Sequence, residues 1–220
     1  MGKSASKKKS ATAFAASDDE SARGRLLHAA THLFCRYGIN ATGIDAIINE
    51  AGTAKTTLYK LFGSKTNLVN AVLESEGKAW REWFIGAMED GGGDAQAKLT
   101  RFFPALKRWF AEERFYGCPF INAVAEHDKD ARQFRNIALR HKKVVLSHIE
   151  KLAGEICAAE PQVLAHQLAL LIDGAIVAAM VSRDPGVADT AGLAAGSLFG
   201  PSRVKKPKRT SGAAAQLVAV

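Results

Sequence analysis

The chain has 220 residues, of which 47% are hydrophobic and 24% charged; this balance can bury a core and excludes a globally disordered protein. Its three cysteines, Cys35, Cys118 and Cys157, are far apart and lack CxxC spacing, which argues against a disulfide framework or a zinc site and favours a reducing cytoplasm. The net charge of +8 comes from residues 1–67 and 201–220, so we expect one end of the protein to meet a polyanion such as nucleic acid.

The first half of the chain reads as helices separated by glycines. Residues 1–19 are Lys-, Ser- and Ala-rich, which predicts a disordered basic arm. From Ser21, apolar residues recur at three- and four-residue spacing up to Gly38, which predicts one helix. Thr42 is expected to open a second helix that ends at Gly52, with Asp45 in a near capping-box position.

The pattern stays helical over the rest of the chain. A short third helix is expected at 54–61, and a long fourth helix should run from Lys65 to about Met88. After the break at 89–95, Pro104 is expected to bend a fifth helix. Further helices are expected at 119–127, 130–159, 161–182 and 187–199. Strand-like alternation is not evident, so the predicted fold is all-α with a basic tail at 201–220.

The most apolar run, residues 163–181, is interrupted by His166, Gln167 and Asp173. These polar residues favour a buried helix over a membrane span. We therefore expect no membrane partner.

Residues 43–62 combine a helix, a glycine-containing turn and a second short helix, which is the helix-turn-helix arrangement of DNA-binding proteins. Leu58 and Phe62 are four residues apart and can pack inward. The residues expected to point outward are Lys55, Thr56, Tyr59 and Lys60. Such hydroxyls and ammonium groups bond to base edges and phosphates, so this helix is predicted to enter a DNA groove.

Residues 21–75 resemble the N-terminal DNA-binding domain of the TetR family of bacterial transcriptional repressors. The matching features are Ala-Ala then Leu-Phe in the first helix, the Tyr-Gly turn, Ala-Thr before the second helix, Ala-Gly after it, and Thr-Leu-Tyr followed by Phe and Ser-Lys. The resemblance implies a helix-turn-helix domain at 20–80. It also implies a larger helical ligand-binding and dimerisation domain at 81–200.

The resemblance also implies which residues contact DNA. Phosphate contacts fall on Thr42, Tyr59 and Lys65, and groove contacts on Lys55, Thr56, Thr57 and Lys60. Gly43 belongs to the same candidate set, although Ser or Thr is common there in the family. Ala54 and Leu61 also depart from the family pattern. Each of these departures removes a possible phosphate contact, and the basic arm could compensate for the lost affinity by binding the DNA backbone.

Two further sites are implied in the C-terminal domain. A pocket for an apolar or aromatic small molecule would be lined by Trp80, Trp83, Phe84, Phe103, Trp109, Phe110, Cys118 and Phe120. A homodimer seam of the last two helices would use Gly174, Ala175, Ala178, Ala179, Gly192 and Ala195. The alternative for both sets is ordinary packing within one protomer.

Other reactive side chains favour no chemistry. His28, His32 and Cys35 are spaced for a metal on one helix, but they lie off its apolar stripe, so solvated side chains are the better interpretation. Cys118 is better interpreted as a buried thiol than as a redox sensor. We therefore expect no metal and no cofactor.

Together these features predict a cytoplasmic, homodimeric and ligand-responsive transcriptional regulator. It is expected to act as a repressor that leaves a palindromic double-stranded DNA operator when a small molecule binds. One alternative is a nonspecific or architectural DNA-binding protein driven by the basic tails. An enzyme with a helical cavity is less favoured, since no nucleophile–base pair or paired carboxylates stand out.

Overall fold

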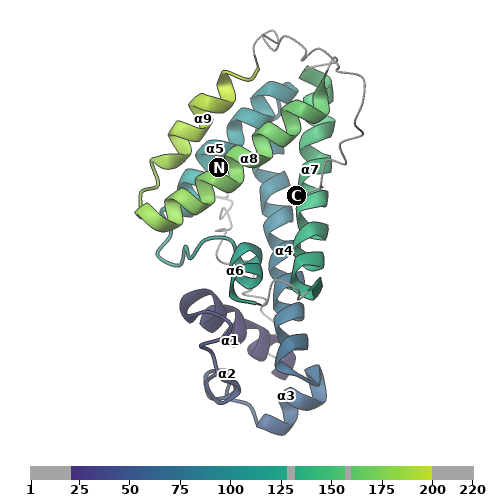
Figure 1. Ribbon diagram of the computed structural model, residues 1–220, viewed down its shortest axis with the longest axis vertical. Helices are drawn as coiled ribbons and strands as arrows, with labels where there is room; N and C mark the ends of the chain where they lie inside the picture. Colours follow the sequence, from purple (N-terminus) through teal and green to yellow (C-terminus); the bar gives the residue numbers. More distant parts are fainter. Residues whose placement is uncertain (1–20, 128–131, 157–159, 200–220) are drawn as a thin grey trace, which may run out of the picture.

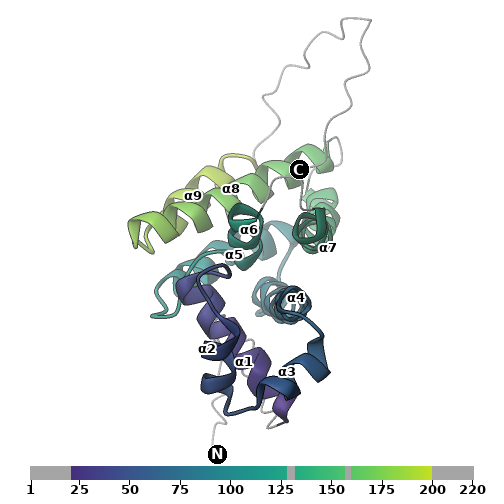
Figure 2. The same cartoon turned by 60° about the horizontal axis from the view of Figure 1, so that its bottom comes forward.

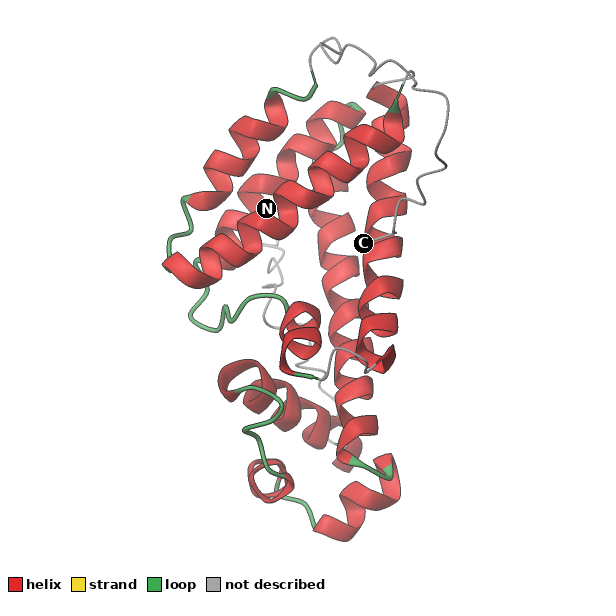
Figure 3. Cartoon of the chain, viewed as in Figure 1, coloured by secondary structure: helices red, strands yellow, loops and turns green. Residues whose placement is uncertain are grey.

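The protein is helical throughout the part of the chain that the computed structural model describes, residues 21–127, 132–156 and 160–199 (Figures 1 and 3). Its helices are α1 (Ala22–Tyr37), α2 (Ile44–Ala51), α3 (Lys55–Phe62), α4 (Lys65–Glu89), α5 (Ala95–Phe110), α6 (Pro119–Glu126), α7 (Arg132–Ile156), α8 (Pro161–Ser182) and α9 (Val187–Gly196). The all-α prediction is confirmed. The predicted basic arm at 1–19, the tail at 201–220 and Cys157 lie outside the described residues.

Helices α1, α2 and α3 gather at one end of the molecule around the first half of α4 (Figures 1 and 2). Leu26, Ile47, Leu58 and Leu68, one from each of these four helices, are fully buried. Burying side chains of this size contributes about 1.5–3 kcal/mol each. This small core sets the position of α3, which projects at the end of the molecule.

The long helix α4 joins this end to the rest of the protein (Figure 1). Ser64 caps it, since its hydroxyl accepts the N–H of Asn67 at 3.1 Å. In its second half, Phe84 and Met88 are buried, and this half packs against α5 and α7. The same helix therefore contributes buried side chains to the core at both ends of the molecule.

Helix α8 is long and apolar enough to cross a membrane by length and composition. In the fold it packs against α7, α9 and α5. Its buried side chains are Leu164, Ala165, Leu168, Ile172, Ala175, Ile176 and Ala179. One face of α8 therefore belongs to the core of the protomer, in line with the expectation of a helix buried in the fold.

Several helix boundaries differ from the sequence prediction, among them the start of α2 and the end of α9. Helix α2 begins at Ile44 with Gly43 as its N-cap, one residue later than a helix capped by Thr42. Helix α9 ends at Gly196 rather than at residue 199, because the chain continues as turns with i→i+3 hydrogen bonds at Leu198 and Phe199.

Candidate nucleic-acid interface

A tight turn sets α3 at an angle to α2. Gly52 ends α2 with φ +59°, a left-handed conformation that favours glycine, and its N–H donates to the carbonyls of Ile48 and Asn49. Helix α3 then begins after Ala54, whose N-cap position carries no side-chain oxygen. Helix α3 thus lies at the end of the molecule that α1 and α2 also form (Figure 2).

The two faces of α3 differ in the predicted way. Leu58 is fully buried and Phe62 is 8% exposed, so these two side chains anchor the helix. On the opposite side Thr56, Tyr59 and Lys60 are exposed. Thr57 is half-buried at the edge of this face. Short hydroxyls, a phenol and an ammonium group are left to face a partner.

Lys55, at the start of α3, is held by an ion pair. Its Nζ donates to Oδ1 of Asp45 at 3.0 Å. This hydrogen bond is the main reason that the Lys55 pKa is raised above its usual value. The sequence analysis predicted that Lys55 contacts a DNA groove, but it did not predict the ion pair with Asp45 of α2.

Contacts from α1 support the helix-turn-helix from behind. Arg25 Nε donates to the carbonyl of Ala51 at 3.1 Å, and the Arg23 guanidinium lies 5.6 Å from the centroid of the Phe62 ring. His32 Nδ1 lies 2.7 Å from Oε1 of Glu50. Sequence reasoning missed these supports, because residues off the apolar stripe of α1 read as solvated.

The sequence profile described as "Bacterial regulatory proteins, tetR family" matches residues 26–72, which are the helices just described. The chain belongs to the TetR family. It is therefore a helix-turn-helix transcriptional regulator of a non-enzymatic family.

Known proteins align over most of this TetR-family chain. The crystal structure of the TetR-family regulator SCO4454 from Streptomyces coelicolor is 28% identical and superposes with a TM-score of 0.75, covering 81% of this chain and 94% of that one. An uncharacterised HTH-type regulator of Lactococcus lactis is 24% identical over 171 residues, 76% of this chain and 87% of its own length. The activator FasR of Mycolicibacterium smegmatis is 46% identical over 52 residues, or 24% of each chain.

Thr42 does not lie where a phosphate contact was predicted. Its side chain is 3% exposed, and its hydroxyl donates to the carbonyls of Gly38 at 2.7 Å and Leu33 at 3.3 Å. Threonine hydroxyls often bond to nearby backbone carbonyls in this way. Thr42 therefore fixes the loop between α1 and α2, and we leave its side chain out of the DNA contacts proposed below.

Two further candidate DNA contacts, Gly43 and Lys65, lie at the starts of α2 and α4. Lys65, the first residue of α4, is half-buried, and burial lowers its pKa while the charge of Glu126 acts in the opposite direction. Gly43 is exposed, and a Cβ at that position would meet no atom within 4 Å. The N-terminus of α2 is thus open to solvent.

Helix α6 ties the DNA-binding end of this regulator to its C-terminal helices. The backbone N–H of Asn40 donates to Oε2 of Glu126 at 2.9 Å, and the Asn40 side-chain amide donates to the Glu126 carbonyl at 2.6 Å. Beside this contact lies a cavity of about 20 Å³. Its lining residues are Phe34, Cys35, Ile39, Val69, Val72, Leu73, Pro119, Asn122 and Glu126.

A buried carboxyl group lies near this junction. The pKa of the Cys35 thiol on α1 is raised to about 12, mainly by burial and further by the negative charge of Glu76 on α4. Burial alone raises the pKa of Glu76 to about 7. Its Oε1 is buried and finds no hydrogen-bond partner among the described residues. A group of this kind makes folding depend on pH.

The residues predicted to bind a ligand form a ring-to-ring cluster. Trp80 stacks on Phe84 with centroids 4.8 Å apart, and Trp80 and Trp83 each lie 6.0 Å from the Trp109 ring. Phe110 packs on Phe115 at 4.9 Å. Rings at these distances fill the interior themselves.

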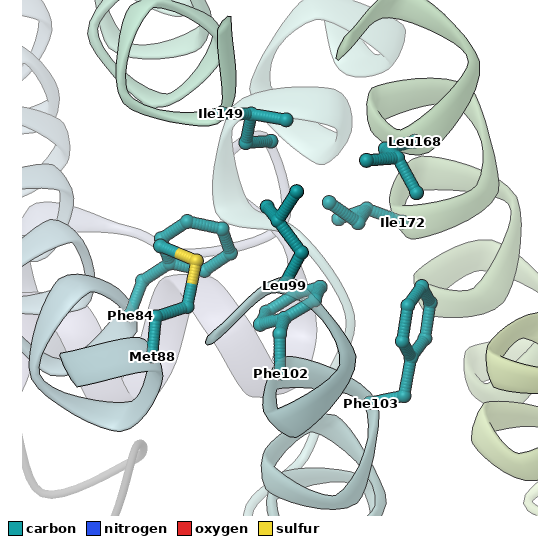
Figure 4. Close-up of a pocket in the computed structure, with 8 residues that line it drawn as sticks. All are labelled: Phe84, Met88, Leu99, Phe102, Phe103, Ile149, Leu168 and Ile172. Carbon is teal, nitrogen blue, oxygen red and sulfur yellow. The ribbon is translucent and has the colours of Figure 1, made fainter. Parts of the chain in front are cut away.

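A small cavity borders this cluster (Figure 4). Its volume is about 10 Å³, and it is lined by Phe84, Met88, Leu99, Phe102, Phe103, Ile149, Leu168 and Ile172. Phe84 and Phe103 are the predicted residues that line it; the other lining residues were not predicted. Since this space holds at most one water, a ligand would have to displace side chains.

His141 of α7 is a buried polar residue that the sequence did not single out. Phe120 of α6 stacks on its ring at 4.1 Å, and Arg81 Nη1 lies 3.1 Å from its Nδ1. Burial is the main reason that its pKa is lowered to about 3. Cys118, the N-cap of α6, is buried as well, and burial raises its pKa, as expected of an unreactive thiol.

The predicted dimer residues divide into two groups. Gly174 and Ala178 are exposed on α8. Ala175, Ala179 and Ala195 are buried within the protomer, at 3%, 1% and 0% exposure.

Gly192 also packs inside the protomer, since a Cβ there would lie 3.2 Å from the Cβ of Phe103. The prediction that these small residues form one seam needs this correction: four of them pack α8 and α9 onto their own core.

Other apolar side chains of α8 and α9 are exposed. Leu170, Val177 and Val181 of α8 are 69%, 38% and 76% exposed, and Leu193 of α9 is 77% exposed. With Gly174 and Ala178, the α8 residues recur at i, i+4, i+7, i+8 and i+11, which is one face of a helix. We call this surface the α8–α9 face.

Proposed function

We propose that this regulator is a homodimeric repressor that binds a palindromic operator with one α3 from each protomer. The observation that carries the proposal is the division of α3, where Leu58 and Phe62 anchor a helix whose Thr56, Tyr59 and Lys60 face outward. A helix of this size and composition fits the major groove. Because operators lie on chromosomal DNA, the protein would act in the bacterial cytoplasm.

The proposed contacts combine positioning and readout. Tyr59 and Lys65 would bind phosphates, together with the backbone N–H groups after Gly43 at the open N-terminus of α2. The groove contacts would come from Lys55, Thr56, Thr57 and Lys60. Phosphate contacts fix the register, whereas groove contacts select the sequence.

The α8–α9 face supports the proposed dimer. Contiguous exposed apolar surface on a protein commonly marks an interaction site. Pairing α8 and α9 with their copies would cover Leu170, Val181 and Leu193 and would give two α3 helices related by a two-fold axis. A palindrome matches that symmetry.

Repression requires only that the bound dimer block access to the DNA. One relative is named as an activator, but its similarity covers 52 residues, about the size of the DNA-binding part. We propose repression because it needs no contact with a third protein.

The proposed signal is an apolar or aromatic small molecule that enters the ring cluster. Trp80 Nε1 is buried and finds no hydrogen-bond partner among the described residues, so a ligand acceptor could pair with it. Moving the rings on α4 would shift the helix that carries Lys65. The contact between Asn40 and Glu126 would pass the shift to the α1–α2 loop, so that the two α3 helices no longer match the half-site spacing.

We expect Lys60→Ala to weaken binding to the operator by about 1–3 kcal/mol if Lys60 reads base edges. Affinities for the operator and for a random duplex, measured at one salt concentration, test this. Lys78→Ala is the matched control, since Lys78 is an exposed lysine of α4 that pairs with Glu82 and lies outside α3. An equal loss on both duplexes would mean that Lys60 contacts only phosphate.

A further inference from the structure

An acidic side chain lies against the first residue of the recognition helix. Asp45 is in the first turn of α2, and Lys55 opens α3. Their carboxylate and ammonium groups are 3.0 Å apart, with the side chains 75% and 54% exposed. A negative charge on a surface that must approach phosphates is unfavourable for binding, which raises the question of what it does there.

The ion pair limits where the Lys55 ammonium can go. Lysine is a point charge on a flexible stem, which can swing toward the nearest phosphate. Its ammonium has three donors, and the bond to Asp45 uses one of them. Two donors stay available for the groove, while the stem is held between α2 and α3.

The carboxylate also lies in the first turn of α2. Gly43 and Ala54 provide no side-chain cap, so these ends attract phosphates through their unbonded N–H groups and the helix dipole. Asp45 places a negative charge beside the end of α2. This repulsion acts on DNA of any sequence alike, so by itself it leaves the ratio of operator to random affinity unchanged.

We propose that Asp45 is a specificity-determining positioning residue that directs Lys55 toward base edges and keeps it from binding phosphate. The inference rests on the proposed operator-binding function. Because an exposed ion pair contributes little to stability, the role lies in DNA discrimination rather than in the fold.

The test is a cycle of Asp45→Asn, Lys55→Gln and the double variant in the full-length chain. Affinities are measured over a salt series on two duplexes, one enriched by the wild-type protein from random DNA and one of random sequence. Glu74→Gln is the control, since it removes the same charge from an exposed side chain of α4, outside the helix-turn-helix.

Releasing Lys55 adds about one phosphate contact, so Asp45→Asn should steepen the salt slope on random DNA by about 0.9. The ratio of operator to random affinity should fall about five- to tenfold. In the Lys55→Gln background the same change should leave slope and ratio unaltered. Glu74→Gln should leave the salt slope on random DNA and the ratio as they are in the wild-type protein.

The inference is overturned if Asp45→Asn leaves the ratio of operator to random affinity unchanged. It is also overturned if Asp45→Asn lowers this ratio equally in the Lys55→Gln background. In both cases the proposed function stands. A wild-type protein that enriches no sequence and binds both duplexes alike overturns the proposed function and this inference with it.

Discussion

At pH 8 the Glu76→Gln variant is expected to be more stable than the wild-type protein, and at pH 5 most of this advantage is expected to disappear. The pKa of Glu76 is raised from 4.5 to about 7 by burial. Folding therefore favours its protonated form, so stability is full below about pH 4.5 and is lost as pH rises through 7. At 1.36 kcal/mol per pKa unit, the pH-dependent difference approaches about 3 kcal/mol.

Denaturant unfolding at the two pH values and one protein concentration measures this difference. Comparing two pH values cancels the cost of burying the new amide, which does not titrate. Glu74→Gln is the control: it lies on the same helix, but its side chain is 67% exposed and lies 3.8 Å from Arg140. An equal gain at pH 5 and pH 8, or the same pH dependence in Glu74→Gln, would contradict the account.

The Ala178→Glu variant is expected to be a helical monomer that no longer binds the operator. Ala178 is exposed in the protomer, so the new side chain is compatible with the fold. In the proposed dimer it would be buried next to Val177 and Val181, and the two-fold axis would place a carboxylate on both sides. Burying unpaired charge costs several kcal/mol per ion.

Light scattering for mass, circular dichroism for helicity and footprinting for binding separate the outcomes. Ala97→Glu is the matched control, since Ala97 is exposed on α5 and should leave the dimer intact. Ala195→Glu is unsuitable, because Ala195 is fully buried and the variant would unfold. A stable dimer carrying both Ala178→Glu and Leu193→Glu would move the seam away from the α8–α9 face.

The helix-turn-helix could be predicted because its signals are local. Gly38 and Gly52 adopt the positive φ angles that end helices, and the spacing of Leu58 and Phe62 identifies the inner face of α3. Each signal depends on residues a few positions apart. Helix periodicity therefore identified every helix that the structure describes.

Contacts between distant residues could not be predicted in this way. Asp45 and Lys55 pair across the turn, and Glu76 reads as a solvated charge until α4 packs against α1. The Thr42 hydroxyl could have capped α2 or donated to carbonyls earlier in the chain. Only the loop geometry selects its hydrogen bonds to the carbonyls of Gly38 and Leu33. Pairing partners are set by the tertiary fold.

The C-terminal ligand and dimer sites stay predictions, because composition does not define a face of a helix. Helix α8 is apolar on nearly all sides, so its small residues could pack inside the protomer or across a dimer axis. Ala175 and Ala179 pack inside, whereas Ala178 is exposed. The aromatic residues likewise fill space that they were expected to line.

Selection of bound sequences from random DNA by the full-length protein tests the central claim most directly. A dimer that presents two α3 helices should enrich a palindrome whose half-site centres lie about one helical turn, or a whole multiple of it, apart. Enrichment of a single unrepeated site, or of no sequence at all, would contradict the account.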